Sequence, residues 1–187
     1  MTIETINFDN ITYLQNGNTK QKQAYVTLTD NQVLFKIQKF DPILVGTIPI
    51  SIDIEKSDLD IICYFKSKKD FKKSILLHFS TQKNFTIREQ MISGNLAIVA
   101  NFTINQFEIE IFGQNIPVKQ QLGYRHMIIE YQLLRQFGES FRQQIIELKE
   151  QGHKTEAAFG IVLGLTTDPY IESLKFETID KIMNVNL

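Results

Sequence analysis

The sequence predicts an α+β protein whose first 115 or so residues combine strands with helices and whose remaining residues are helical. Two observations predict this class. Before Gly113, several segments alternate apolar and polar residues with the period of a strand, and after Gly113 apolar residues recur with the period of a helix. We therefore expect an α+β core over residues 1–115 and a carboxy-terminal helical region over residues 116–187 packed on that core.

The first predicted elements are a helix and a short strand. Asn16-Gly17-Asn18 can turn the chain and cap a helix that runs to about Asp30. Residues 43–45 have the pattern of a short buried strand, and Gly46 permits a tight turn directly after it.

The middle of the chain predicts a strand, a helix and three further strands. The strand covers residues 58–65, and the helix after it carries a basic run that we interpret as a solvated helix face. Residues 84–92 and 96–104 are rich in strand-forming residues and read as a hairpin, and residues 107–112 form the last predicted strand.

Helices are predicted beyond residue 116. Pro117 suits a first helical turn, residues 124–134 carry an apolar stripe, and Gly138 is a plausible end for that helix. Further helices are predicted over residues 139–151, over residues 155–163 and after a cap at Asp168-Pro169.

The composition is that of a globular domain in a reducing compartment. Of 187 residues, 43% are hydrophobic and 22% are charged, which suffices for a full core. A formal net charge of −1 gives no strong signal for binding a long nucleic acid. Cys63 is the sole cysteine and has the strand parity of a core residue, so neither a disulfide within the chain nor a cysteine-based zinc site is expected.

The expected location is the cytoplasm. The first residues lack a basic segment followed by an apolar run, and no stretch approaches 18 consecutive apolar residues. We therefore expect neither secretion nor a membrane partner.

Three pairs of acidic residues share the spacing of one intervening residue, namely Asp53/Glu55, Asp58/Asp60 and Glu108/Glu110. Chance alone gives about 2.3 such pairs at this composition, so their number is uninformative and only their context can matter. The plain alternative is a solvated sheet face, because alternation in a strand places polar side chains toward water.

The pair Asp58 and Asp60 favours a metal site over that alternative. Both side chains project from the same side of a strand, and two carboxylates at about 6 to 7 Å repel by about 2.5 kcal/mol at an effective dielectric near 20. A divalent cation removes this repulsion. Glu108 and Glu110, on a later strand, can complete a carboxylate site suited to Mg²⁺ or Mn²⁺.

Two features near these acids suggest phosphate binding. Gly46 lies 12 residues before Asp58, and a glycine followed by the Thr47 hydroxyl and N–H at a helix start can hold a phosphate. Arg125, on a predicted helix, can contact a phosphate with two donors, although an exposed arginine is the plain alternative. Beside it, His126 and Glu130 have the spacing of a surface pair.

An apolar residue followed by Gly46-Thr47, then Asp58-x-Asp60, then a strand acid resembles the motif of the DNA polymerase beta-like nucleotidyltransferase superfamily. More closely, most of the chain resembles a bacterial family of uncharacterised domains within that superfamily. The segments that carry this closer resemblance are residues 41–50, 57–64, 107–114, 124–127 and 154–159.

The resemblance implies a nucleotidyltransferase-like mixed sheet with flanking helices and a helical carboxy-terminal part over a nucleotide cleft. It implies that Asp58 and Asp60 are catalytic metal ligands and that Gly46 and Thr47 hold the triphosphate. Either Glu108 or Glu110 would supply the third catalytic acid and metal ligand, and the sequence leaves this choice open because both project from the same face.

The leading functional hypothesis is therefore a Mg²⁺-dependent nucleotidyltransferase that moves a nucleoside monophosphate from an NTP to an acceptor hydroxyl on a small molecule, an RNA end or a protein. The main alternative is a non-catalytic module that keeps the fold to bind a nucleotide or a protein. A third hypothesis is a structural protein with a solvated acidic sheet face.

Overall fold

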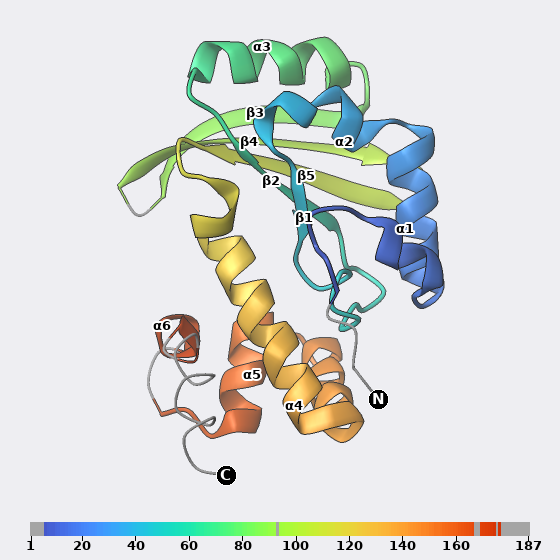
Figure 1. Cartoon of the computed structure of the whole chain (residues 1–187), viewed down its shortest axis with the longest axis vertical. Coiled ribbons are helices and arrows are strands. Elements are labelled where there is room, and N and C mark those ends of the chain that lie inside the picture. The colour runs from blue at the N-terminus through green and yellow to red at the C-terminus, as the bar shows by residue number, and fades with distance from the viewer. Residues whose placement is uncertain (1–5, 93, 167–168, 175, 177–187) are drawn as a thin grey trace. The chain divides into compact units, whose positions relative to one another are not determined.

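The computed structural model describes residues 6–92, 94–166, 169–174 and 176 (Figure 1). The chain divides into two compact units. The first comprises Met1–Ser51 and Ser57–Tyr124, and the second comprises Ile52–Lys56 and Arg125–Leu187. The division predicted from the sequence after residue 115 stays a prediction.

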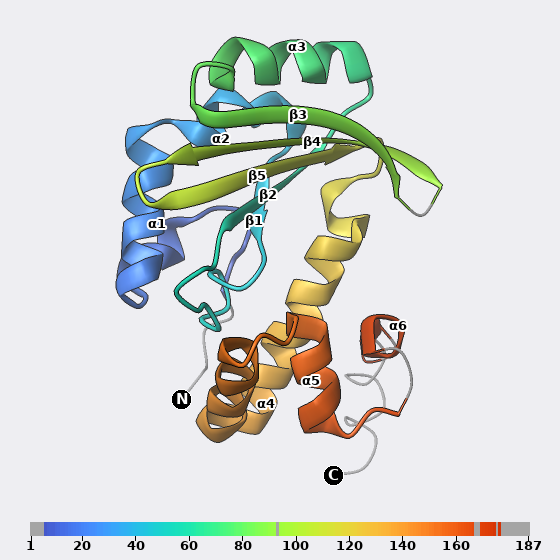
Figure 2. The ribbon, with the colours of Figure 1, turned by 180° about the vertical axis from the view of Figure 1, so that it is seen from behind.

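A five-stranded sheet forms the centre of the first unit, with the strand order β1-β2-β5-β4-β3 (Figure 2). The strands are β1 (Ile43–Val45), β2 (Leu59–Tyr64), β3 (Lys83–Ile92), β4 (Asn95–Ile104) and β5 (Phe107–Gln114). Strands β2 and β5 run parallel, whereas all other neighbouring strands run antiparallel. The sheet is therefore mixed, and the predicted α+β fold class is confirmed.

The helices of the first unit follow the capping signals in the sequence. They are α1 (Thr19–Asp30), α2 (Val33–Lys36) and α3 (Lys68–Phe79), joined by the 3₁₀ turns η1 (Thr12–Asn16), η2 (Gln38–Phe40) and η3 (Val118–Gln120). At the start of α1, the Gln21 N–H donates to the Asn18 side chain at 2.8 Å and the Asn18 N–H donates to the Gln21 side chain at 2.9 Å. This reciprocal cap confirms the predicted helix start.

The core lies between these helices and one face of the sheet. Apolar side chains of α1, α2 and α3 pack against alternate residues of β2, β4 and β5. Phe79 of α3, for example, stacks on Phe102 of β4 with ring centroids 4.7 Å apart. Cys63 is fully buried in the same core, as its parity predicts. The residues of opposite parity consequently lie on the other face of the sheet.

Helix α4 (Leu122–Glu150) spans the boundary between the two units and is interrupted at Gly138, where φ is 76° and the backbone is not helical. The predicted helix end at Gly138 is thus confirmed. Helix α5 (Thr155–Leu163) also matches its prediction, and α6 (Pro169–Ser173) follows. Asp168, the predicted cap of that last helix, lies outside the described residues.

The role predicted for Pro117 is wrong. Pro117 precedes η3, and Gln121 then takes an extended conformation before α4 begins. The Gln121 side-chain amide donates to the carbonyls of Cys63 and Ile116, at 2.8 Å each. These contacts hold Gln121 in an extended conformation, which prevents a continuous helix from running from Pro117 into α4.

The predicted surface pair His126 and Glu130 is also wrong, because the side chains are only 4% and 6% exposed. Both lie on the buried face of α4 within the second unit. Burial, reinforced by the Glu156 carboxylate and opposed by the Lys149 ammonium, raises the pKa of Glu130 to about 8. The second unit thus contains a carboxyl group that favours its neutral form.

Among the described residues, no helix is both long enough and apolar enough to cross a lipid bilayer.

Candidate functional site

The structure places Gly46 directly against Asp60. Val45 at the end of β1 pairs with Asp60 of β2, and Gly46 follows with a φ of +86°. A Cβ atom at residue 46 would lie 2.6 Å from Asp60 Oδ2, which is closer than real Cβ contacts allow. The positive φ favours glycine at this position, and a methyl group there would displace the Asp60 carboxylate from its present position.

Thr47 does not begin a helix, so this part of the predicted phosphate site is wrong in its geometry. Residues 47–51 form consecutive turns, in which the Ser51 N–H donates to the Ile48 carbonyl at 3.2 Å. Ser51 has a φ of +60°, which is incompatible with a continuing α-helix. The Thr47 hydroxyl lies 3.1 Å from the hydroxyl of Ser57, a residue to which the sequence had given no role.

The two aspartates lie at the start of β2 in different surroundings. Asp58 is exposed and precedes the strand, whereas Asp60 is half-buried within it. Because Leu59 and Ile61 point into the core, Asp60 projects from the sheet face that the core helices do not cover.

Of the two glutamates, Glu110 is the direct neighbour of Asp60. The parallel register pairs Asp60 with Glu110, while the antiparallel register pairs Glu108 with Thr103 on the other side of β5. Glu110 is half-buried, whereas Glu108 is exposed. Continuing the β2–β5 register by two residues brings Glu108 level with Asp58.

Glu110 also belongs to a polar network that the sequence did not reveal. The Asn101 side-chain amide donates to Glu110 Oε2 at 3.1 Å, and Arg88 Nη2 lies 3.5 Å from the same oxygen. Arg88 also donates to Asn101 Oδ1 at 2.5 Å. Its positive charge offsets the repulsion between neighbouring carboxylates. The alternation of residues in the hairpin could have predicted that Arg88 and Asn101 lie on this face of the sheet. It could not have predicted that they lie beside Glu110.

The carboxylates do not form a closed metal cage. Across the described residues, no group of three or more His, Cys, Asp and Glu side chains is arranged to hold a metal ion. Asp58 and Asp60 nevertheless provide hard oxygen donors two residues apart. Such a pair fits Mg²⁺, which commonly binds one or two protein carboxylates and takes its other ligands from water and substrate phosphates.

Arg125 belongs to the second unit, where it is half-buried near the start of α4. Its predicted contact with a phosphate stays a prediction.

Residues 26–176 match the family described as "Domain of unknown function (DUF4269)". The chain belongs to this family. The match spans most of the sequence and includes every residue of the candidate site. No curated protein sequence matches the chain.

Solved structures with a similar fold include a poly(U) polymerase. One is the Cid1 poly(U) polymerase with MgGTP bound, at a TM-score of 0.52 and 10% identity, covering 74% of this chain and 46% of that one. Another is the GLD-2/RNP-8 complex, at a TM-score of 0.51 and 12% identity, covering 82% of this chain and 61% of that one. A further Cid1 structure, described by its RNA terminal uridylyl transferase activity, has a TM-score of 0.52 and 9% identity, covering 74% and 45%.

These similarities establish a nucleotidyltransferase-like fold for the DUF4269 chain. The chain spans about half the length of the polymerase chains that it matches. At such low identity the similarity concerns the fold alone.

Proposed function

We propose that this protein is a Mg²⁺-dependent nucleotidyltransferase that transfers a nucleoside monophosphate from an NTP to an acceptor hydroxyl. The observation that carries the proposal is the contact between Gly46 and the Asp60 carboxylate, beside an acidic residue of the neighbouring strand. This contact brings a backbone turn without a side chain to the carboxylate of an Asp-x-Asp strand. A triphosphate can approach such a turn closely.

Asp58 and Asp60 would hold the cation. Bound Mg²⁺ supplies charge neutralisation for the phosphates and for the leaving group. The protein itself holds the two metal-binding carboxylates in position. Asp60 is anchored within β2 and faces away from the core, while Asp58 stands in solvent at the strand's start, where an incoming nucleotide can reach it.

Gly46 and Thr47 would position the triphosphate. The turn at Gly46 exposes backbone to a phosphate group, and the Thr47 hydroxyl, now 3.1 Å from Ser57, can donate to a phosphate oxygen. Arg125 is proposed as a further phosphate ligand through its planar pair of donors. These contacts would orient the NTP for in-line attack.

The chemistry is a single displacement at the α-phosphorus. The acceptor oxygen forms a bond to this phosphorus, the bond to the bridging oxygen of the β-phosphate breaks, and pyrophosphate leaves. The proton of the acceptor hydroxyl passes to a carboxylate of the site.

We assign the third acid to Glu110 rather than Glu108. The register makes Glu110 the direct neighbour of Asp60, and Arg88 and Asn101 restrain its carboxylate. Glu108 is exposed, and in the described part of the chain no side chain restrains its carboxylate in this way. A carboxylate that is held in one position by its neighbours is better suited to bind a metal ion in a catalytic geometry.

The acceptor stays open among a small molecule, an RNA end and a protein. The similar structures include a poly(U) polymerase and a protein with RNA terminal uridylyl transferase activity, which supports testing RNA first. The matched region is less than half of each of those chains, so we extend their activity to this chain only as a proposal.

The experiment is incubation of the full chain with each α-labelled NTP, Mg²⁺ and a panel of RNA ends, small hydroxyl compounds and proteins. Transfer of label by the wild type, and its loss in Asp58→Asn/Asp60→Asn, is the expected result. Asp53→Asn/Glu55→Gln removes an acid pair of the same spacing and should retain transfer. Equal transfer by wild type and the Asp58→Asn/Asp60→Asn variant would remove the proposed mechanism.

One observation favours the non-catalytic alternative. Glu110 already has protein partners in Arg88 and Asn101, so its charge is balanced without a metal. A module of this kind would show a higher melting temperature with NTP and Mg²⁺ but no transfer to any acceptor. If neither NTP nor Mg²⁺ alters the melting temperature of wild type, the result favours the third hypothesis, a structural protein with a solvated acidic sheet face.

A further inference from the structure

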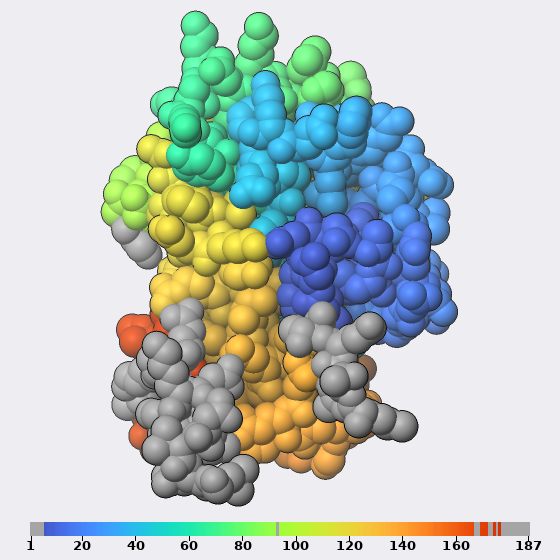
Figure 3. Space-filling model, viewed as in Figure 1, coloured from blue at the N-terminus to red at the C-terminus, as the bar shows by residue number. Residues whose placement is uncertain are grey.

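A cavity of about 450 Å³ lies in the first unit between α3 and the segment formed by α2 and η2. Figure 3 shows these elements adjoining on the upper part of the molecule's face, with α2 and η2 in blue and α3 in green. Its volume is in the range of ligand sites. None of the residues proposed to bind the nucleotide lines it.

The cavity is lined by more cations than anions. Lys36, Lys39 and Lys73 line it together with His78, and Asp70 is the carboxylate among the described residues that line it. Among the described residues, no carboxylate lies within ion-pair distance of these three lysines. The ammonium groups of Lys36 and Lys39 lie over the rings of Phe79 and Phe40, at 5.8 and 4.8 Å from the ring centroids. These contacts leave the positive charges unneutralised, so a carboxylate of a ligand can pair with them.

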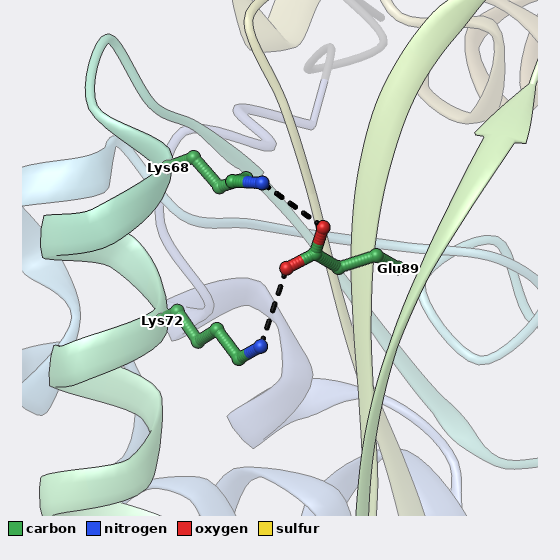
Figure 4. A network of polar contacts seen from close by, with 3 residues as sticks. All are labelled: Lys68, Lys72 and Glu89. Atoms are coloured by element: carbon green, nitrogen blue, oxygen red, sulfur yellow. Dashed lines mark hydrogen bonds and ion pairs between the residues drawn. The ribbon is translucent and has the colours of Figure 1, made fainter.

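The neighbouring lysines of α3 show the contrast. Lys68 and Lys72 project from another face of the helix, where their ammonium groups lie 3.1 and 3.2 Å from the two carboxylate oxygens of Glu89 on β3 (Figure 4). The basic run of this helix thus has two parts. In one part, Lys68 and Lys72 share the single carboxylate of Glu89, and in the other part Lys73 lines the cavity.

Two large apolar side chains also line the cavity and are unusually exposed. Phe35 is 64% exposed and Leu77 is 73% exposed, which places them, with Met91 at 65%, among the most exposed large hydrophobic side chains of the described residues. Covering each would contribute about 25 cal/mol per Å² of apolar area. Two such side chains in one concave, basic site indicate a ligand with both apolar and acidic groups.

A protein segment meets this chemistry better than a nucleic acid does. Leu77 offers neither a stacking face for a base nor a hydrogen bond, whereas it packs well against an aliphatic or aromatic side chain. The cations are lysines, without the paired donors of arginine that favour phosphate. The formal net charge of −1 likewise gives no general attraction to a polynucleotide.

We propose that this cavity docks an acidic amphipathic segment of a partner protein. One large apolar side chain of the segment packs between Phe35 and Leu77, and its Asp or Glu side chains face Lys36, Lys39 and Lys73. This is an interaction surface separate from the carboxylate site, and it does not depend on the proposed enzymatic function.

The test is selection of binders from a displayed library of random 16-residue peptides on the immobilised full chain. Enriched peptides should be acidic and carry apolar residues at helical spacing. Measured by fluorescence anisotropy, their affinity should fall at least tenfold in Lys36→Gln/Lys39→Gln/Lys73→Gln and in Leu77→Ser. Asp58→Asn/Asp60→Asn should bind them like wild type, which separates this test from that of the nucleotidyl transfer.

Two matched variants control for general charge and hydrophobicity. Lys22→Gln/Lys66→Gln/Lys83→Gln removes three exposed lysines outside the cavity, and Met91→Ser removes an exposed apolar side chain elsewhere. Both should retain the affinity of wild type.

The proposal is overturned if no peptide is enriched, or if the enriched peptides bind the cavity variants and wild type equally. It is also overturned if a 15-mer oligouridylate binds wild type but not the lysine variant while no peptide is enriched. That last result would assign the cavity to nucleic acid.

Discussion

The Asp60 carboxylate occupies the space that a side chain at residue 46 would need: its Oδ2 atom lies 2.6 Å from the position of a Cβ on Gly46. The relation links the turn after β1 to the acid of β2 through the antiparallel pairing of Val45 with Asp60. It also couples the conformation of the turn to the position of the carboxylate, and this coupling can be tested by adding a single methyl group.

Gly46→Ala should both destabilise the protein and abolish nucleotidyl transfer. Its positive φ costs about 1–2 kcal/mol for a residue with a Cβ, and the clash with Asp60 costs about 1–3 kcal/mol more. Gly94→Ala is the matched control, because Gly94 has a φ of +77° but nothing within 4 Å of the added Cβ. Urea denaturation of both variants isolates the clash. An equal loss of stability in the two variants would contradict it.

Glu110→Gln should lower the transfer rate at least a hundredfold, and Glu108→Gln less than threefold. The reason is register, since Glu110 is level with Asp60 and Glu108 is exposed two residues away. Initial rates at saturating NTP, with wild type measured alongside, provide the comparison. A larger loss in Glu108→Gln would move the third acid to that residue.

The stability of the second unit should fall as the pH rises from about 4.5 toward 8. The pKa of Glu130 is raised to about 8, chiefly by burial, so the folded state holds a proton that the unfolded state releases. The protonated Glu130 contributes its full share of the stability at a pH below the pKa that Glu130 has in the unfolded chain. This share is lost as the pH rises to about 8, at up to about 1.4 kcal/mol per pH unit.

Glu130→Gln should remove most of this slope and be more stable than wild type above pH 8. Glu147→Gln, on the exposed side of the same helix, should keep the slope of wild type. Urea midpoints between pH 5 and 9 measure it. A slope unchanged in Glu130→Gln would show that another group is responsible.

Lys149→Met should destabilise the second unit by about 1–3 kcal/mol. The Lys149 ammonium donates to the Ile52 carbonyl at 2.7 Å and thereby holds the 52–56 segment to α4. Methionine keeps most of the apolar stem but leaves this carbonyl without that donor. Lys154→Met, at an exposed position, is the control. Equal denaturation midpoints for the two variants would refute the role of this bond.

Local signals in the sequence predicted features of both units correctly. The cap at Asn18 and the parity of Cys63 depend on side chains within a few residues of each other, and both are confirmed. The break at Gly138 follows from the backbone freedom of one residue. Such features need no knowledge of distant contacts.

Features that depend on packing were predicted less well. His126 and Glu130 have the spacing of a surface pair, yet the helix turns that face inward. The periodicity of a helix shows which residues share a face, but a polar pair does not reveal that its face is buried. The helix start predicted at Thr47 was wrong for a similar reason. Residues 47–51 form turns, and Ser51 adopts a positive φ that packing in the folded chain imposes.

The periods of strand and helix in the sequence were enough to predict the fold class, the order of most elements and the acidic residues that share one face of the sheet. Three relations required the folded chain: Glu110 is the neighbour of Asp60, Arg88 and Asn101 restrain Glu110, and Gly46 leaves room for the Asp60 carboxylate. These relations are set by strand order and register, which bring together residues far apart in the chain.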